Sequence, residues 1–356
     1  MAAGSFASLR ENVKYYQENN YAQLIRTIDL KNNFTNSDFV YVDEVAYDFL
    51  WRVQLKEPNI VLPNIGANIG EKYYVKPQDL PKNKNVLGPN AILLRSKCND
   101  THFVYFRLST SSYDNEMKKL VGASGQPKFN KTDLKKVSLF MPSLIEQKRI
   151  AYFLALLEER IATQNKIIDK LQSLIKGIRN DVFGKLRKDI GLNAKVGDVL
   201  SYEQPQPYIV EDTEYTAGGT PVLTANKAFV LGYTSETDGI YDKGDCIIFD
   251  DFTLDCKYVD FPFKVKSSAI KILTAKNKEL LRYTFEFLKY LDLSTDEHKR
   301  HYIAETQNQE FILPTTQIVR TIAHAFSTLS SRMQTIVKQR DMLELQKQYL
   351  LRQMFI

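Results

Sequence analysis

The sequence predicts an α+β protein in which two mixed α/β modules alternate with two long helices. Two stretches of about forty residues carry a heptad pattern, and the second is a degraded copy of the first. The segments before them contain short β-branched and aromatic runs separated by turn residues, which is typical of sheet and loops. The predicted domains are residues 1–140 (module 1), 141–187, 188–312 (module 2) and 313–356.

The first predicted helix begins at the sequence PSLIEQ. Ser143 can cap the helix while the side chain of Glu146, three residues later, reaches back to the Ser143 amide. Beyond the cap, seam positions recur in alternating steps of four and three, with one polar residue among them: Ile150, Leu154, Leu157, Ile161, Gln164, Ile168, Leu171 and Ile175. The pattern continues through Ile178 and Val182, and a seam of this length predicts a helix packed along another helix.

The second copy lies 172 residues later and begins at Pro314. Its seam positions are Ile322, Phe326, Leu329, Met333, Ile336, Arg340, Leu343 and Leu350, with Arg340 and Lys347 as polar interruptions. The two copies share their starting proline, the phase of the seam and a terminal phenylalanine, Phe183 and Phe355. These shared features indicate an internal repeat. The simpler alternative is a helical hairpin that only stabilises a domain.

Composition limits the class of protein. A chain of 356 residues exceeds one ordinary core, and 44% hydrophobic with 25% charged residues is typical of globular proteins. We find no apolar core of signal-peptide type and no run that could span a bilayer. Three cysteines without CxxC spacing predict neither a zinc site nor a disulfide framework, so we expect a cytoplasmic location.

The net charge of +6 is unevenly distributed. The four predicted domains carry formal charges of +5, +4, −7 and +4 in chain order. A basic first module suits phosphate contacts, whereas an acidic second module opposes non-specific attraction to nucleic acid.

Residues for catalysis do not assemble from the sequence. The four histidines lack metal-ligand spacing, and there is no GxGxxG or Walker motif. The best catalytic candidate is the fragment FDDFTLDCK, where Asp250, Asp251, Asp255 and Lys257 resemble a metal-dependent nuclease centre. Because so short a motif often occurs by chance, a nuclease stays only an alternative.

The organisation resembles the specificity subunits of type I restriction-modification systems. The resemblance is carried by residues 142–151 (PSLIEQKRIA), by YEQPQPYIV (202–210), TPVLTANKAFVLGYTSETDGIY (220–241), IIFDDF (247–252), KYVDFPFKVKSSAIKIL (257–273) and HKRHYIAE (298–305), and in module 1 by LIRTIDLKNNF (24–34), NIGANIGEKYYV (64–75) and GASGQPKFNKTDLKKVSLFMPS (122–143). It covers nearly the whole chain. The second copy departs from it, since Ile318 and Val319 stand where the first has Glu146 and Gln147.

The resemblance implies two target-recognition domains joined by an antiparallel coiled-coil pair of helices with pseudo-two-fold symmetry. Each domain would recognise half of a bipartite site in double-stranded DNA, and the helices would recruit two methyltransferase subunits. The chain would hold no cofactor and be no enzyme. Its methyltransferase and motor-nuclease partners would use S-adenosylmethionine, ATP and Mg²⁺. The alternatives are a stand-alone restriction endonuclease of type II kind and a coiled-coil scaffold that only dimerises.

DNA recognition needs cations for phosphates and amide, hydroxyl or guanidinium groups for base edges. Such residues in turn-rich stretches are, in module 1, Arg26, Lys31, Asn64, Asn68, Lys72, Gln126 and Lys128. In module 2 they are Thr224, Lys227, Lys257, Lys264, Lys266, Ser267, Lys299 and Arg300. Any one lysine among them is more often an ordinary solvated residue.

The seam also predicts a register. If the helices are antiparallel with matched ends, Ile150 faces Met354, Gln164 faces Arg340 and Lys347 faces Leu157. Arg340 can then donate to the Gln164 amide oxygen, so two polar defects become one pair that fixes the register. The alternative is that both cationic side chains extend outward to water.

Overall fold

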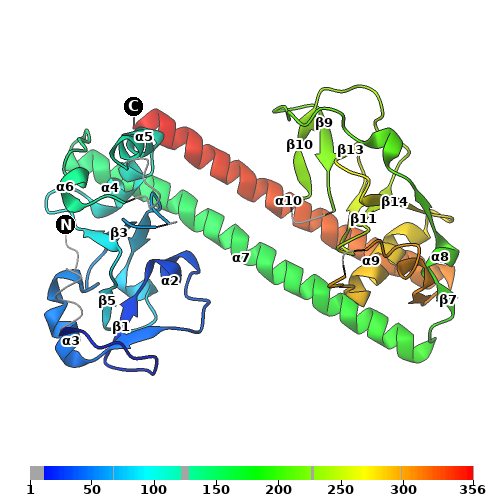
Figure 1. Cartoon of the computed structure of the whole chain (residues 1–356), viewed down its shortest axis with the longest axis horizontal. Helices are drawn as coiled ribbons and strands as arrows, with labels where there is room; N and C mark the ends of the chain where they lie inside the picture. The colour runs from blue at the N-terminus through cyan, green and yellow to red at the C-terminus, as the bar shows by residue number, and fades with distance from the viewer. Residues whose placement is uncertain (1–11, 67, 122–127, 226–227, 298, 356) are drawn as a thin grey trace. The chain divides into compact units, whose positions relative to one another are not determined.

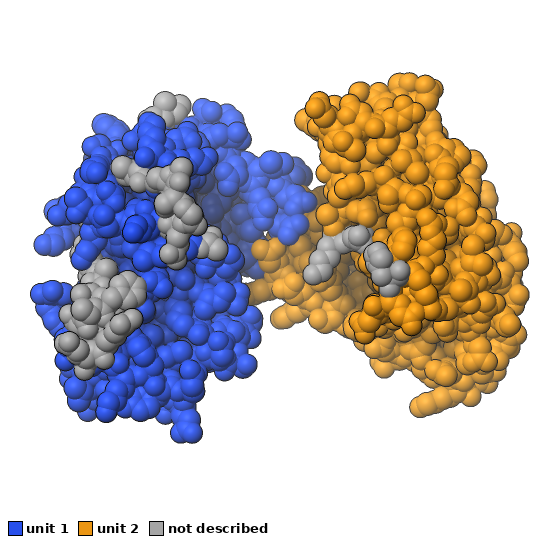
Figure 2. Space-filling model, viewed as in Figure 1, with its two compact units in different colours: residues 1–163, 340–356 blue, residues 164–339 orange. Residues whose placement is uncertain are grey.

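The computed structural model describes residues 12–355 except 67, 122–127, 226–227 and 298. Two long helices are present, α7 (Leu144–Asp189) and α10 (Thr316–Met354), which confirms the predicted α+β class (Figure 1). By internal contacts the chain divides into unit 1, residues 1–163 with 340–356, and unit 2, residues 164–339 (Figure 2). The division falls within both helices, so each unit contains one module and one end of each helix.

Unit 1 contains two small sheets. In the first, β1 (Ala22–Ile25) lies between β2 (Val40–Val42), antiparallel, and β5 (Asn85–Leu87), parallel. In the second, β3 (Asn59–Pro63) pairs antiparallel with β4 (Tyr73–Val75) and β6 (Ala91–Leu94). All five residues of β3, NIVLP, are buried, and the last four form the continuous apolar run expected of a central strand. Helices α2 (Thr27–Lys31), α3 (Glu44–Phe49), α4 (Thr101–Leu108), α5 (Ser111–Leu120) and α6 (Lys131–Leu134) complete the module.

Unit 2 is built around a four-stranded antiparallel sheet in the order β12 (Cys256–Val259), β11 (Cys246–Asp250), β14 (Ile270–Ala275), β8 (Leu200–Glu203). A second sheet places β9 (Thr220–Leu223) between β10 (Val230–Thr234) and β13 (Lys264–Val265). The strands β7 (Ala194–Lys195) and β15 (Glu310–Phe311) pair antiparallel. Helices α8 (Val196–Val199) and α9 (Leu280–Leu291) complete the module.

The capping signal at the start of α7 is confirmed. The Ser143 amide donates to Glu146 Oε2 at 3.2 Å, and the Glu146 amide donates to Ser143 Oγ at 3.4 Å. These two bonds satisfy amide groups that the first turn of a helix leaves unpaired. The Glu146 carboxylate therefore has a structural role.

The two helices are antiparallel within each unit. In unit 1, Lys347 Nζ lies 2.6 Å from Glu158 Oε1, while Leu154 shares a buried cluster with Leu351. In unit 2, the Arg179 guanidinium lies 5.8 Å from the Phe326 ring centroid, while Phe183 shares a buried cluster with Val319 and Ile322. In both units a higher number on α7 meets a lower number on α10, as expected for antiparallel helices.

The seam differs from the prediction at one end. Lys347 was predicted to face Leu157, and its ammonium pairs with the next residue, Glu158. At the C-terminal end of α10, Leu351 is 3% exposed whereas Leu350 is only partly buried. A straight helix has 3.6 rather than 3.5 residues per turn, so its apolar face drifts from a strict heptad. Gln164 and Arg340 belong to different units, and their pairing stays a prediction; Arg340 Nε donates to Asp341 Oδ1 at 2.7 Å.

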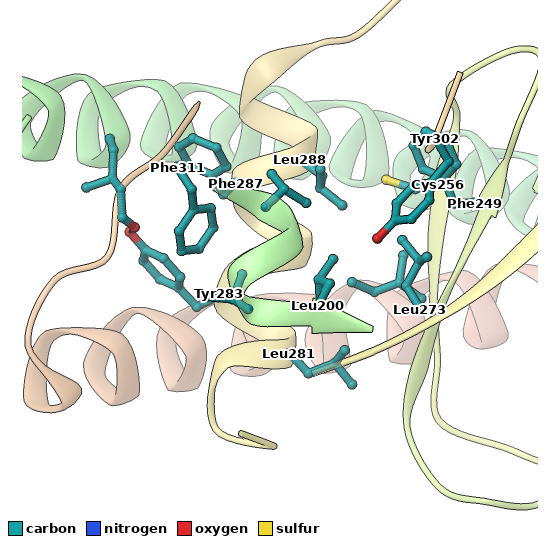
Figure 3. Close-up of a cluster of buried hydrophobic side chains, with 14 of the residues drawn as sticks. Leu200, Phe249, Cys256, Leu273, Leu281, Tyr283, Phe287, Leu288, Tyr302 and Phe311 are labelled. Carbon is teal, nitrogen blue, oxygen red and sulfur yellow. The ribbon is translucent and has the colours of Figure 1, made fainter. Parts of the chain in front are cut away.

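Equivalent positions of the repeat hold each module against the helices. Phe183 packs its ring against Tyr283 and Phe287 of α9, at centroid distances of 5.3 and 5.5 Å. Phe355 packs against Phe103 of α4, at 5.2 Å. Each phenylalanine of the repeat therefore anchors one helix end on the helix of its own module. Figure 3 shows part of the cluster in unit 2, in which Tyr283 and Phe287 of α9 lie beside Phe311.

The Glu158–Lys347 pair predicts a pH dependence in unit 1. Burial raises the Glu158 pKa, but the nearby imidazole of His102 and the ammonium of Lys347 outweigh burial, so the pKa lies below the usual 4.5. A carboxylate with a depressed pKa stabilises the fold above its unfolded-state pKa and loses that effect as pH falls through its folded-state pKa. Glu158→Gln should therefore be less stable than the wild type at pH 7, and the difference should shrink as the pH falls below the ordinary glutamate pKa. Urea unfolding at several pH values measures this. A difference that stays constant as the pH is lowered from 7 through the acid range would contradict the assignment.

Candidate nucleic-acid interface

Three of the candidate residues in module 1 meet at one surface. Lys31, the last residue of α2, donates from Nζ to Asn68 Oδ1 at 2.9 Å and to Glu71 Oε1 at 2.9 Å. Lys72 follows in the same β3–β4 connection and pairs with Asp114 of α5. Lys31 and Lys72 line a hollow of about 410 Å³. Residues far apart in the sequence thus place two lysines and one amide together, each lysine is paired with a carboxylate, and the Lys72 side chain is only 11% exposed.

The turn NIGANIG shapes this surface. Gly66 and Gly70 have φ of +90° and +92°, in the left-handed region that side chains other than glycine rarely adopt. The side-chain amide of Asn64 donates to the Phe129 carbonyl oxygen at 3.0 Å, and Ile65 forms a β-bridge with Lys128. Asn64 is therefore a structural residue that ties the turn to a later loop. The exposed Lys128 lies on that loop, whereas Gln126 falls outside the described residues.

Arg26 also serves the fold. Its guanidinium donates to Asp29, with Nη2 2.7 Å from Oδ1, and its backbone amide donates to Asp29 Oδ2 at 2.8 Å. Asp29 is completely buried, so this guanidinium compensates a buried charge. Arg26 was expected to contact DNA, and in the structure its guanidinium forms these contacts within the module.

In module 2 the candidates gather where two parallel strands end. β13 pairs parallel with β9, which places Val265 beside Leu223. Thr224, Lys266 and Ser267 follow directly, and the Lys266 amide donates to the Leu223 carbonyl oxygen at 3.1 Å. Lys266 and Ser267 are exposed, and Thr224 is half-buried. The candidate Lys227 lies outside the described residues.

Lys264 is not available at the surface, contrary to expectation. Its side chain is 4% exposed, and Nζ lies 2.7 Å from Glu236 Oε2 and 2.6 Å from the Asp238 carbonyl oxygen. The end of β13 explains the difference, because Lys264 lies within the strand whereas Lys266 follows it. Lys264 stabilises the loop around Gly239.

The other basic candidates of module 2 form separate groups. Lys257 lies 3.3 Å from Asp255 on the edge strand β12. Lys299 pairs with Glu297 and Glu305, and the half-exposed Arg300 lies over the Phe252 ring at 5.8 Å. The carboxylates around Lys299 reduce its attraction for phosphate.

The carboxylates of the nuclease alternative do not converge. Asp250 Oδ1 accepts from the Phe252 and Thr253 amides, and Asp251 Oδ1 accepts from the His301 and Tyr302 amides. Asp255 pairs with Lys289 at 3.1 Å. Within the described part of the chain, no three His, Cys, Asp or Glu side chains are grouped to hold a metal ion. Each carboxylate therefore has a structural explanation.

Sequence reasoning missed a larger cavity in unit 1. About 700 Å³ in volume, it is lined by Asn33, Phe34, Lys72, Lys76, Tyr73, Tyr74 and His102, among others. Asn33 and Phe34 both have positive φ, of 47° and 57°, an uncommon pair of conformations for residues with side chains. The only sequence signal was the Asn-Asn pair, since asparagine tolerates this region. Such strain is often found where a loop is shaped for binding.

One exposed lysine from each module predicts a salt-dependent effect. Lys31→Ala and Lys266→Ala should each weaken DNA binding uniformly across sequences and lower the slope of log K against log salt by about 1. Lys119→Ala is the control, because Lys119 is an exposed lysine of α5 outside both groups. Fluorescence titration at four salt concentrations measures the slope. An unchanged slope would remove that residue from the interface.

Known proteins that resemble this chain in sequence come from type I restriction-modification systems. Residues 9–173 match the family model for the type I restriction modification DNA specificity domain. A specificity subunit of the type I restriction enzyme EcoR124I/EcoR124II, from Escherichia coli, is 45% identical over 126 residues, which cover 33% of this chain and 31% of that protein. The chain thus matches about a third of that relative's length.

Two solved structures share the fold. The S subunit of a type I restriction-modification system from M. genitalium gives a TM-score of 0.57 at 17% identity, covering 84% of this chain and 83% of that one. A structure concerning complex assembly and conformational transition of the type I R-M system gives a TM-score of 0.51 at 12% identity, covering 97% and 92%. Both likenesses concern the fold. The chain is therefore similar, over residues 9–173, to the type I restriction modification DNA specificity domain, and it shares its fold with these two structures.

Proposed function

We propose that the chain is the non-catalytic DNA-recognition subunit of a type I restriction-modification complex. Each module recognises one half of a bipartite site in double-stranded DNA, and partner subunits carry out adenine methylation and restriction. The observation that carries this proposal is the specificity-domain match over a module that places Lys31, Asn68 and Lys72 on one surface. The module of unit 2, which has Thr224, Lys266 and Ser267 at its own strand ends, recognises the second half-site.

The chemistry of the complex belongs to the partners. S-adenosylmethionine would be used by two methyltransferase subunits, and ATP with Mg²⁺ by motor-nuclease subunits. In this chain the acidic groups of FDDFTLDCK are engaged by backbone amides and lysines, which gives no support to a nuclease. No described helix has the length and apolarity to cross a membrane. We expect the complex to act in the cytoplasm.

Apolar side chains on the long helices suit the methyltransferase subunits. In unit 1, α7 exposes Ile145 and Tyr152 at 67% and 68%, and α10 exposes Leu345 and Tyr349 at 68% and 57%. Residues 145, 152 and 156 lie on the face of α7 opposite the buried positions Leu154 and Leu157. Apolar stripes of this size on a folded helix usually mark an interface. Tyr152→Glu should therefore abolish co-purification with the methyltransferase subunit while leaving the chain folded.

The proposal is tested with the purified chain. Incubated alone with DNA and Mg²⁺, it should not cleave, and sequence-selective binding should appear once the methyltransferase subunits are added. Cleavage without partners would favour the endonuclease alternative. Absence of selectivity in the assembled complex would favour the scaffold.

A further inference from the structure

A single buried carboxylate connects module 2 to both long helices. Glu286 of α9 is 1% exposed. Arg179 of α7 donates to its Oε2 from Nε at 2.9 Å and from Nη2 at 2.8 Å. Arg282 of α9 donates from Nη2 to Glu286 Oε1 at 2.7 Å and to the Phe326 carbonyl oxygen of α10 at 3.3 Å, and it also bonds Ser330 Oγ. We call this cluster the α9 clamp.

The α9 clamp supplies something that the surrounding apolar core does not. Phe183, Phe287 and Tyr283 bury a large apolar surface, but the hydrophobic effect has no preferred direction. Well-packed apolar residues can often replace a buried ion pair without loss of stability. Guanidinium–carboxylate bonds, in contrast, require a defined mutual orientation. The clamp therefore restricts the angle at which α9 lies on α7 and α10.

Unit 1 holds its module through different contacts. Its corresponding ionic contact is Glu158 of α7, with 29% of the side chain exposed, which pairs with Lys347 and lies 3.9 Å from His102 of α4. A lysine ammonium is a point charge that tolerates several orientations. Of the two ionic contacts, the one in unit 2 is the more directional.

We propose that Glu286 is a positioning residue that fixes the orientation of module 2 on the helices and thereby restricts the spacer length between the two half-sites. This inference rests on the proposed DNA-recognition function. Each additional base pair displaces a half-site by about 3.4 Å and rotates it by about 35° around the DNA axis. A module held at one angle cannot follow that rotation, whereas a module free to turn on its core can.

The test uses the complete chain assembled with its methyltransferase subunits. The probes are duplex oligonucleotides that carry the motif returned by methylation mapping, with the native spacer or with one base pair added or removed. The variants are Glu286→Gln and Arg179→Lys, the second of which keeps its charge and is expected to fold if the first does not. Glu279→Gln is the matched control, because Glu279 also joins the start of α9 to α10, through Arg320 at 2.6 Å, but is 39% exposed.

The readout is the ratio of affinities for native and altered spacers. In both clamp variants this preference should fall by roughly tenfold, equivalent to about 1.4 kcal/mol, while Glu279→Gln keeps the wild-type ratio. A clamp that serves stability alone would lower the yield or weaken binding to every spacer equally. An unchanged ratio in folded, DNA-binding variants would overturn the inference. Absence of motif-specific binding by the wild-type complex would instead remove the proposed function, and with it this inference.

Discussion

Phe183→Ala should destabilise unit 2 by about 3–5 kcal/mol, a large fraction of the free energy of unfolding of an ordinary domain. The Phe183 side chain is completely buried and lies 5.3–5.5 Å from the rings of Tyr283, Phe287 and Tyr290. Its removal leaves a cavity where α7 meets α9, and the surrounding rings relax only partly. Urea unfolding followed by circular dichroism measures the loss.

Phe153→Ala provides the control for this prediction. Phe153 lies on the same helix but is 42% exposed, so its truncation should change the free energy of unfolding by no more than about 0.5 kcal/mol. If Phe183→Ala cost less than about 1 kcal/mol, the ring would not be the anchor that its burial indicates.

Exchanging module 2 should change one half of the recognised DNA sequence completely and leave the other half intact. If residues 188–312 are replaced by the corresponding module of another specificity subunit, module 1 and both helices keep their own contacts. The donor must present an aromatic and an acidic residue where Tyr283 and Glu286 stand, because Phe183 and Arg179 remain in the recipient helix. Mapping of methylated adenines in cells that carry the exchange measures the outcome.

The same exchange also tests whether the contact between α9 and the long helices sets the spacer length. With a donor that retains an acid at position 286, the spacer length should persist. A change in both half-sites would show that the modules do not recognise DNA independently. If the exchanged module left the recognised motif unchanged, the residues that recognise this half-site would lie outside residues 188–312.

Local features of the fold were predictable because their causes lie close together in the sequence. The capping box needs only Ser143 and Glu146, and the heptad seam needs only the spacing of apolar residues such as Leu154 and Leu157. The turn at Gly66 and Gly70 follows from the φ values that glycine permits.

Contacts between distant residues were not predictable from such patterns. Gln147 is 2% exposed because its side chain accepts from the Asp100 amide and donates to Asn99 and the Pro142 carbonyl oxygen. The equivalent residue of the second copy, Val319, is equally buried but lies in an apolar cluster. The same repeat position thus makes polar contacts in the first copy and apolar contacts in the second. The sequence alone does not identify the contacting residues in either case.

The candidate DNA contacts show the same limit. Lys264 and Lys266 are separated by a single residue in the sequence, yet Lys264 is buried beside Glu236 and Lys266 is exposed at a strand end. Both were predicted to contact DNA because they are lysines in a turn-rich stretch. Which of them meets solvent depends on where β13 ends and on the loop that supplies Glu236.

The central claim is that this chain directs methylation to a bipartite DNA site, and mapping methylated adenines genome-wide with and without its gene tests it most directly. We predict one motif made of two specified halves around an unspecified spacer, methylated only when the gene is present together with its partner subunits. A methylation pattern that is the same in both strains would contradict the claim.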